Sequence, residues 1–271
     1  MTVYPNCKIN LGLNIVGVRP DGYHDIETVF YPVPLCDRLT VEPAAGETDT
    51  LVAEGIPVAG NMAENLVVRV IGMLRRDGFA IPPLDITLEK NIPSGAGLGG
   101  GSGDAAAMMR LVNEMFQLGM EKDEMRQRIA ELGADCPFFV ENRPMFAQGI
   151  GDRIEPAEIS LSGWFLTLIK PDIFVSTKEA YASVQIKKPN KSIKQIIKSS
   201  VETWKGVLCN DFEEPVFARH SAIGRIKETL YAKGAIYASM SGSGSCVYAL
   251  SRTPIILEGA FGGCFRYQCV L

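Results

Sequence analysis

The chain has 271 residues, which is longer than one average domain, and 46% hydrophobic and 21% charged residues, which is ordinary globular usage. We therefore expect folded lobes rather than a disordered chain. The formal net charge of -4 and the lack of a dense Lys/Arg run argue against nucleic-acid binding.

Membrane insertion and metal-ligating cysteine clusters are also disfavoured by the sequence. No segment approaches the roughly 18 apolar residues that a membrane-spanning helix requires, and Pro5, Asn6 and Lys8 interrupt the position of a signal peptide. The seven cysteines are scattered and form no C-x-x-C pair, which favours reduced thiols. We expect a cytoplasmic protein with no membrane partner.

The first third of the chain shows strand patterns. Apolar residues alternate with polar or small ones from Ile9 to Ile15, which predicts a strand with one buried face. Lys8 and Asn10 lie on the other face of that strand. Further strand-like runs at residues 27–33, 38–43 and 84–90 indicate that the first third of the chain is rich in antiparallel sheet.

Helical patterns follow these strands. A helix is expected from Asn61, where Asn61 and Glu64 resemble a capping box, to Gly78. Two more are expected over 104–118 and 122–132, each ended by a glycine in the left-handed conformation, at Gly119 and Gly133.

The pattern of predicted strands and helices changes after Pro144. Residues 164–171 predict a buried strand, 190–205 a helix, 214–233 one or two helices, and 235–250 a hairpin. We therefore expect two α+β lobes, at residues 1–154 and 155–271.

The strongest local signal is the segment PSGAGLGGGSGDAAA, which starts at Pro93 and has six glycines between Gly95 and Gly103. Exposed backbone N–H groups before a helix form a site for phosphate. The spacing of Gly95, Gly97 and Gly100 fits a dinucleotide loop, but a helix follows where that fold needs a strand. Walker and protein-kinase loops are excluded, since the Gly-Lys-Ser/Thr, H-R-D and D-F-G strings are absent.

This glycine-rich segment resembles the central motif of the GHMP kinases. Three further segments resemble the diphosphocytidyl-methylerythritol kinase branch of that family in the same order: CKINLGLNIVGVRPDGYHDIETVF, LGADCPFFVENRPMFAQGIGD and MSGSGSCVYAL. The resemblance implies a two-lobe GHMP fold, with an N-terminal lobe like domain 2 of ribosomal protein S5 and a ferredoxin-like C-terminal lobe. Gly103 departs from the family, which usually has a serine there.

The resemblance also implies the activity. ATP would phosphorylate the 2-hydroxyl of 4-diphosphocytidyl-2-C-methyl-D-erythritol in isoprenoid precursor synthesis, with Mg²⁺ carried mainly by the phosphates, since no protein ligand is evident. Another GHMP kinase, of homoserine or mevalonate type, and a non-catalytic nucleotide-binding relative remain as alternatives. The oligomeric state is not indicated.

The family motifs assign roles to individual residues. Asp135 is implied as the general base and Lys8 as the cation beside it. Without the resemblance, Asp135 would be interpreted as a structural helix N-cap and Lys8 as an exposed lysine on an edge strand. The residues implied for ATP are Asn65 and Leu66 at the adenine and Pro93, Gly95, Ala96, Gly97, Leu98, Gly99, Gly100, Gly101 and Ser102 at the phosphates. The residues implied for the acceptor substrate are Asn10, and Tyr23, His24 and Tyr181 at the cytidine.

Overall fold

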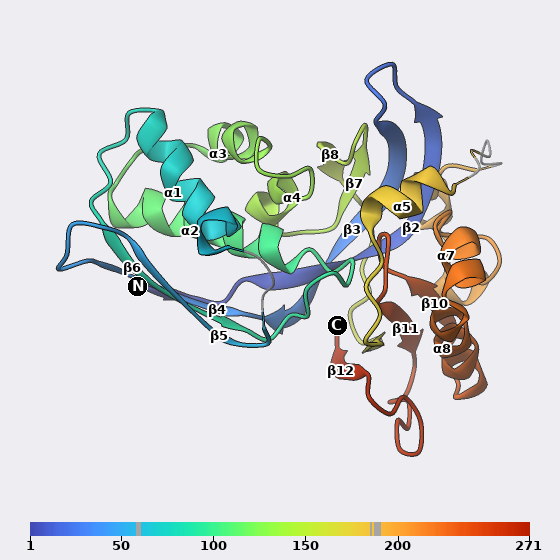
Figure 1. Ribbon diagram of the computed structural model, residues 1–271. Helices are drawn as coiled ribbons and strands as arrows, with labels where there is room; N and C mark the ends of the chain where they lie inside the picture. The colour runs from blue at the N-terminus through green and yellow to red at the C-terminus, as the bar shows by residue number, and fades with distance from the viewer. Residues whose placement is uncertain (58–60, 185, 187–190) are drawn as a thin grey trace. The chain divides into compact units, whose positions relative to one another are not determined.

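The computed structural model describes residues 1–57, 61–184, 186 and 191–271 (Figure 1). They form two compact units built from non-contiguous segments. Unit 1 comprises Met1–Cys7, Leu35–Ser94 and Gly99–Arg143, and unit 2 comprises Lys8–Pro34, Gly95–Leu98 and Pro144–Leu271. The expected lobe boundary at residues 154 and 155 stays a prediction.

Unit 1 contains a sheet with the strand order β1 (Thr2–Val3), β4 (Arg38–Pro43), β6 (Leu84–Lys90) and β5 (Thr50–Gly55). The expected strands at 38–43 and 84–90 are confirmed, and β4 is antiparallel to both β1 and β6. The pairing of β5 with β6 is parallel, so the sheet is mostly antiparallel, with one parallel pair.

Four helices cover one face of this sheet: α1 (Leu66–Arg76), α2 (Gly100–Met115), α3 (Lys122–Ile129) and α4 (Cys136–Glu141) (Figure 1). Buried apolar residues recur along α1 at helical spacing, and Leu84, Ile86 and Leu88 alternate along β6. This matches the periodicities that hydrophobic burial requires of a surface helix and of a half-buried strand.

The predicted start of α1 is wrong. The Oδ1 atom of Asn65 accepts a hydrogen bond from the Val67 amide at 3.1 Å, so Asn65 caps the helix. Asn61 instead caps a 3₁₀ turn, η1 (Met62–Glu64), by accepting from the Ala63 amide. Two asparagines of equal capping ability compete here, and the sequence pattern favoured the earlier one.

The bounds of α2 and α3 also differ from expectation. α2 begins at Gly100 rather than Asp104, directly after Gly99 with φ of 69°. Gln117, with φ of 52°, enters the left-handed region before Gly119 does. Gly133 is not among the positive-φ glycines, and α3 leaves through a turn in which the Leu132 amide donates to the Ile129 carbonyl.

Unit 2 contains two four-stranded sheets. One has the order β2 (Asn6–Val18), β3 (His24–Cys36), β7 (Met145–Gln148), β8 (Arg153–Pro156). The first two residues of β2 and the last two of β3 belong to unit 1. The other has the order β10 (Tyr237–Met240), β11 (Val247–Ser251), β9 (Phe165–Lys170), β12 (Phe265–Val270), all antiparallel. The strands expected at 27–33 and 164–171 and the hairpin over 235–250 are confirmed.

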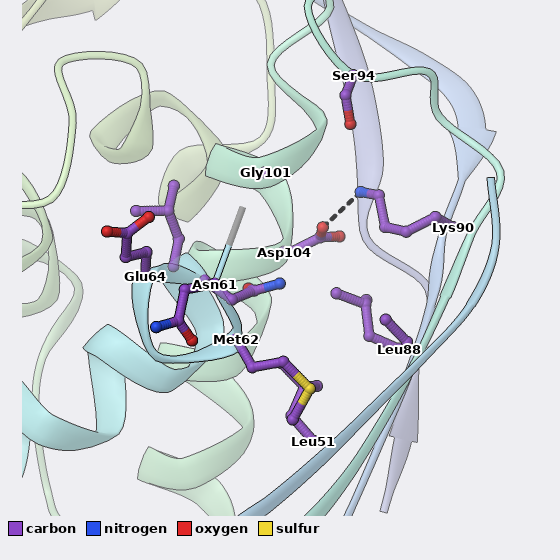
Figure 2. A pocket seen from close by; sticks show the side chains of 12 residues that line it. Leu51, Asn61, Met62, Glu64, Leu88, Lys90, Ser94, Gly101 and Asp104 are labelled. Atoms are coloured by element: carbon purple, nitrogen blue, oxygen red, sulfur yellow. Dashed lines mark hydrogen bonds and ion pairs between the residues drawn. The ribbon is translucent and has the colours of Figure 1, made fainter. Parts of the chain in front are cut away.

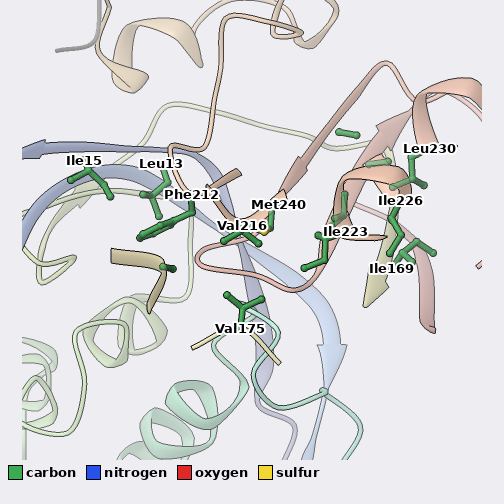
Figure 3. Packing of buried hydrophobic residues seen from close by; sticks show 14 of the residues in the cluster. Leu13, Ile15, Ile169, Val175, Phe212, Val216, Ile223, Ile226, Leu230 and Met240 are labelled. Atoms are coloured by element: carbon green, nitrogen blue, oxygen red, sulfur yellow. The ribbon is translucent and has the colours of Figure 1, made fainter. Parts of the chain in front are cut away.

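The core of unit 2 joins β2 to helices and to the second sheet. Leu13 and Ile15 of β2 belong to one buried cluster with Phe212, Val216 of α7 (Glu213–Arg219) and Ile223 of α8 (Ser221–Ala232) (Figure 3). Of the one or two helices expected over 214–233, the structure has two, and half-buried His220 lies at their junction.

A single helix over 190–205 is not observed, and residue 190 lies outside the described residues. The chain instead forms α6 (Ile193–Ile196) and the 3₁₀ turn η2 (Val201–Thr203); α5 (Thr177–Ala182) precedes them. The Ser199 hydroxyl donates to the Ile196 carbonyl, and the Trp204 indole N–H donates to the Ser199 carbonyl. These side-chain bonds compete with a continuous helix.

None of the helices in the described part of the chain is long and apolar enough to span a membrane.

A buried ionic cluster joins three parts of unit 1. The Lys90 ammonium at the end of β6 donates to Asp104 of α2 at 2.6 Å and to Asp37, which lies between β3 and β4. Burial opposes the charge of Lys90, but the charges of Asp104 and Asp37 outweigh it and raise the Lys90 pKa. Burial raises the pKa of Asp104 to about 7, although Lys90 acts against this shift.

Replacing Lys90 with Met should strongly destabilise the protein. The substitution keeps an apolar stem but leaves Asp37 and Asp104 buried without their counter-charge. We expect the free energy of unfolding, measured by urea denaturation, to fall by about 3–5 kcal/mol. Arg38→Met is the matched control because it breaks the exposed pair with Glu89 on the same sheet. An equal loss of stability in the two variants would contradict the stabilising role of the cluster.

Candidate active site

The glycine-rich loop lies between β6 and α2, and backbone contacts hold its segment Gly95–Leu98 within unit 2. Gly95 and Gly97 have φ of 60° and 72°. A Cβ on Gly97 would lie 1.9 Å from the Ser241 carbonyl oxygen, so the two backbones meet directly. The Ser241 hydroxyl also donates to the Gly97 carbonyl at 2.8 Å, and the Lys8 amide donates to the Leu98 carbonyl at 2.9 Å. Glycine at 97 is therefore a packing requirement.

The second half of the loop becomes the first turn of α2 in unit 1. Gly100, Gly101 and Ser102 are its first three residues, so their amides belong to the unsatisfied N-terminal group of a 16-residue helix. The partial positive charge of that terminus favours an anion.

Gly103 has a structural reason to lack a side chain. A Cβ there would lie 2.6 Å from the Asn6 carbonyl oxygen and 3.4 Å from the Phe139 ring, both within unit 1. The serine usual in the family could not fit here without a shift of the backbone. Glycine at position 103, and with it the absence of a hydroxyl group, is required because α2 packs closely against the start of β2.

A cavity of about 310 Å³ opens beside this helix terminus within unit 1 (Figure 2). Asn65 and Leu66, expected at the adenine, both line it, together with Ser94 and Gly101 of the loop. The remaining lining residues are Leu51, Ala53, Asn61, Met62, Glu64, Leu88, Lys90 and Asp104. Lys90 and Asp104 were not anticipated as site residues, although a lysine ending a buried strand and an acid in a glycine-rich helix start were visible signals.

The polar face of β2 is buried in unit 2, which corrects the exposed-strand interpretation of Lys8. Lys8 and Asn10 are 3% and 2% exposed. The Lys8 ammonium donates to Asn10 Oδ1 at 2.6 Å and lies 4.9 Å from the centre of the Phe30 ring. Asn10 Nδ2 donates to Thr28 Oγ1 at 3.0 Å, and Thr28 in turn donates to the Gly12 carbonyl. Thr28, which the sequence did not reveal, fixes the orientation of the Asn10 amide.

Asp135 stands at the N-cap position of α4, in unit 1. It has αR dihedral angles, φ of -79° and ψ of -17°, and its side chain makes no capping hydrogen bond. The carboxylate is half-buried. Asp135 thus holds the N-cap position as expected but lacks the geometry of a typical cap, which has extended dihedral angles and accepts from the first turn.

The residues expected at the cytidine lie in unit 2, and two of them touch. Tyr23 is 62% exposed after a turn in which the Gly22 amide donates to the Arg19 carbonyl. The His24 and Tyr181 rings stack with centroids 4.8 Å apart and planes at 29°, and Tyr181 meets Phe212 edge-on. Because these two rings stack directly on each other, they form a single aromatic platform.

The described residues contain no group of three or more His, Cys, Asp or Glu side chains that could hold a metal ion. The polar groups near the loop are instead backbone amides, hydroxyl groups, and the carboxylate of Asp104 paired with the Lys90 ammonium.

The contrast between Gly97 and Gly101 predicts different tolerances to alanine. Gly97→Ala would push a methyl group into the Ser241 carbonyl at a positive φ, whereas a Cβ at Gly101 meets only Leu66 at 3.7 Å. We expect Gly97→Ala to lower the melting temperature by several degrees and Gly101→Ala to leave it unchanged or higher, since alanine favours helix. Differential scanning calorimetry checks both, and an unaffected Gly97→Ala would refute the packing argument.

Comparison with known proteins places this geometry in a family. Residues 65–143 match the GHMP kinases N terminal domain and residues 188–255 match GHMP kinases C terminal. The 4-diphosphocytidyl-2-C-methyl-D-erythritol kinase of Bacteroides thetaiotaomicron is 52% identical over 92% of each chain. The Porphyromonas gingivalis protein of the same name is 45% identical over 100% of each chain.

Solved structures agree with these relatives. A crystal structure of 4-(cytidine 5'-diphospho)-2C-methyl-D-erythritol kinase superposes with a TM-score of 0.81 at 29% identity, covering 99% of this chain and 98% of that one. The mevalonate kinase of Methanococcus jannaschii superposes with a TM-score of 0.72 at 13% identity, which shows a shared fold. The chain therefore belongs to the GHMP kinases, within the branch of the 4-diphosphocytidyl-2-C-methyl-D-erythritol kinases, and has their two-lobe α+β fold.

Proposed function

We propose that this ATP-dependent kinase phosphorylates the 2-hydroxyl group of 4-diphosphocytidyl-2-C-methyl-D-erythritol. The observation that carries the proposal is 52% identity over 92% of each chain with a relative of that name. Homoserine and mevalonate kinases share the fold at 16% and 13% identity, which carries no argument about the acceptor. The seven cysteines are scattered along the chain and form no C-x-x-C pair, which supports work in a reducing compartment such as the cytoplasm.

The proposed ATP site in unit 1 combines the cavity with the start of α2, and the family motif adds the preceding glycine-rich loop. The adenine occupies the cavity lined by Asn65 and Leu66, and the triphosphate accepts from backbone amides of the loop and of the first turn of α2. Gly103 offers no hydroxyl. We therefore assign Mg²⁺, which prefers phosphate and water oxygens, mainly to the phosphates, where it would neutralise charge during transfer.

Asp135 is the proposed general base, which accepts the proton of the attacking hydroxyl. The support for this role is the family motif in which Asp135 stands, and the residue is half-buried at the start of α4. Lys8 is the proposed cation of the reaction, and its burial beside Asn10 supports a fixed position for the ammonium. The assignment of both residues to one hydroxyl comes from the family motifs.

Asp135→Asn should remove turnover while preserving binding. The amide keeps the size of the side chain but cannot accept the proton, so we expect kcat to fall roughly a hundredfold or more. The melting temperature and the dissociation constants for an ATP analogue and the cytidine substrate, measured by calorimetry, should stay close to wild type. Asp123→Asn, on a side chain 77% exposed in the same unit, is the control for a generic charge change.

Near-normal kcat in folded Asp135→Asn would eliminate this residue as the base. Lys8→Met adds a separate test, since loss of the buried cation should weaken kcat without weakening binding of the ATP analogue through the loop amides.

His24 is the proposed reader of the cytosine edge, with Tyr181 supporting its ring and Tyr23 beside it in the chain. The stack on Tyr181 fixes the imidazole plane, which supports directional hydrogen bonding by its nitrogen atoms. Cytosine and uracil present opposite hydrogen-bond patterns at positions 3 and 4 of the ring. A reader fixed for one therefore leaves a buried mismatch with the other.

The uridine counterpart of the substrate should be used at least about tenfold less efficiently than the cytidine substrate, because one unmatched buried hydrogen bond has that effect. Steady-state kcat/KM for the two acceptors measures this preference. His24→Phe keeps a ring against Tyr181 but removes the nitrogen atoms, so it should reduce the preference towards one. Equal wild-type efficiencies would rule out base reading.

A further inference from the structure

One oxygen of a buried carboxylate in the unit 1 cavity has no partner. Asp104 is 2% exposed, and its Oδ2 atom accepts from the Lys90 ammonium at 2.6 Å. Its Oδ1 atom has no hydrogen-bond partner among residues 1–57, 61–184, 186 and 191–271. A buried acceptor left unsatisfied is costly in free energy, and native proteins rarely keep one without a reason. A ligand that brings a donor to this atom is therefore favoured.

The surroundings of Asp104 limit what that ligand is. Figure 2 shows Asp104 and Lys90 facing each other at one end of the cavity, with Leu51 and Leu88 among the side chains around it. Two of the three Lys90 N–H groups go to Asp37 and Asp104, which leaves one further donor beside the Asp104 acceptor. A cavity of mixed polar and apolar lining, with a donor and an acceptor at one end, suits a flat heterocycle. A divalent cation is disfavoured, because the Lys90 ammonium lies 2.6 Å from this carboxylate and repels a second cation.

We propose that Asp104 Oδ1 accepts a hydrogen bond from the 6-amino group of the ATP adenine and so determines the choice of phosphoryl donor. The inference rests on the proposed function, in which ATP is the donor and its base lies in this cavity. A 6-oxo purine in the same orientation would point lone pairs at the carboxylate, which is repulsive in a buried site. Asp104 thus selects 6-amino over 6-oxo purine nucleotides.

The electrostatics of the cluster agree with this role. Burial disfavours the ionised form of Asp104, and Asp37 adds a second negative charge behind Lys90. An amino group bound at Oδ1 stabilises the ionised carboxylate by hydrogen bonding. The ligand thereby supplies the contact that the protein leaves open.

Asp104→Asn converts this acceptor into a donor. The amide oxygen must face the Lys90 ammonium, because two donors repel, and the amide NH₂ then occupies the place of Oδ1. We expect the kcat/KM ratio of ATP to inosine triphosphate to fall by about tenfold or more relative to wild type, the effect of one hydrogen bond. A merely structural effect would lower the use of both nucleotides equally.

Asp37→Asn is the matched control, because Asp37 contacts the same ammonium but does not line the cavity. Its ATP to inosine triphosphate ratio should equal that of wild type. An unchanged ratio in folded Asp104→Asn would overturn the assignment while leaving the kinase function intact. Absence of wild-type turnover with ATP would instead refute the proposed function itself.

A second measurement needs no variant, in case Asp104→Asn does not fold. Purine riboside triphosphate has hydrogen in place of the 6-amino group and keeps the other ring atoms. We expect wild-type kcat/KM with this nucleotide to be about tenfold lower than with ATP. Equal values would overturn the proposal, because the amino group would then have no partner in the protein.

Discussion

The ion pair between Lys90 and Asp104 closes the base of the glycine-rich loop. Lys90 is the last residue of β6 and Asp104 lies in the first turns of α2, so a 2.6 Å contact joins the two ends of the segment between them. Asp37 holds the same ammonium and also accepts from the amides of Asn91 and Ile92. A loop with so many glycines would otherwise lose much conformational entropy on ordering, and fixing its ends removes part of that cost.

Glycine serves two different purposes within this closed loop. The amides at the start of α2 are available to an anion, which is what the sequence suggested for the whole segment. Gly97 and Gly103, however, are small because backbone carbonyls of Ser241 and Asn6 approach them within each unit. Glycine count alone could not separate these purposes, since both demand the absence of a side chain.

Local periodicity predicted the elements whose burial is one-sided. The alternation along β6 and the helical stripe of α1 were read correctly, because each element has one face against a core. The same reasoning failed for β2, where Lys8 and Asn10 share a polar face and should have met solvent. Thr28 and Ser241 provide the hydrogen bonds that make their burial possible. Ser241 is distant in sequence, so no local pattern could reveal that Asn10 has these partners.

In the candidate site, too, sequence motifs revealed some residues, whereas others depend on contacts that only the folded structure shows. Family motifs brought Asn65, Leu66 and the loop to attention, and the cavity contains several of them. Lys90 and Asp104 were overlooked because a charged residue at a strand end or near the start of a helix is usually solvated. Their importance follows from stoichiometry: two carboxylates share one ammonium, so the cluster satisfies Lys90 better than it satisfies Asp104. Because the two oxygens of Asp104 are used separately, one residue can hold the loop through Oδ2 and, in the proposed site, accept from the adenine through Oδ1.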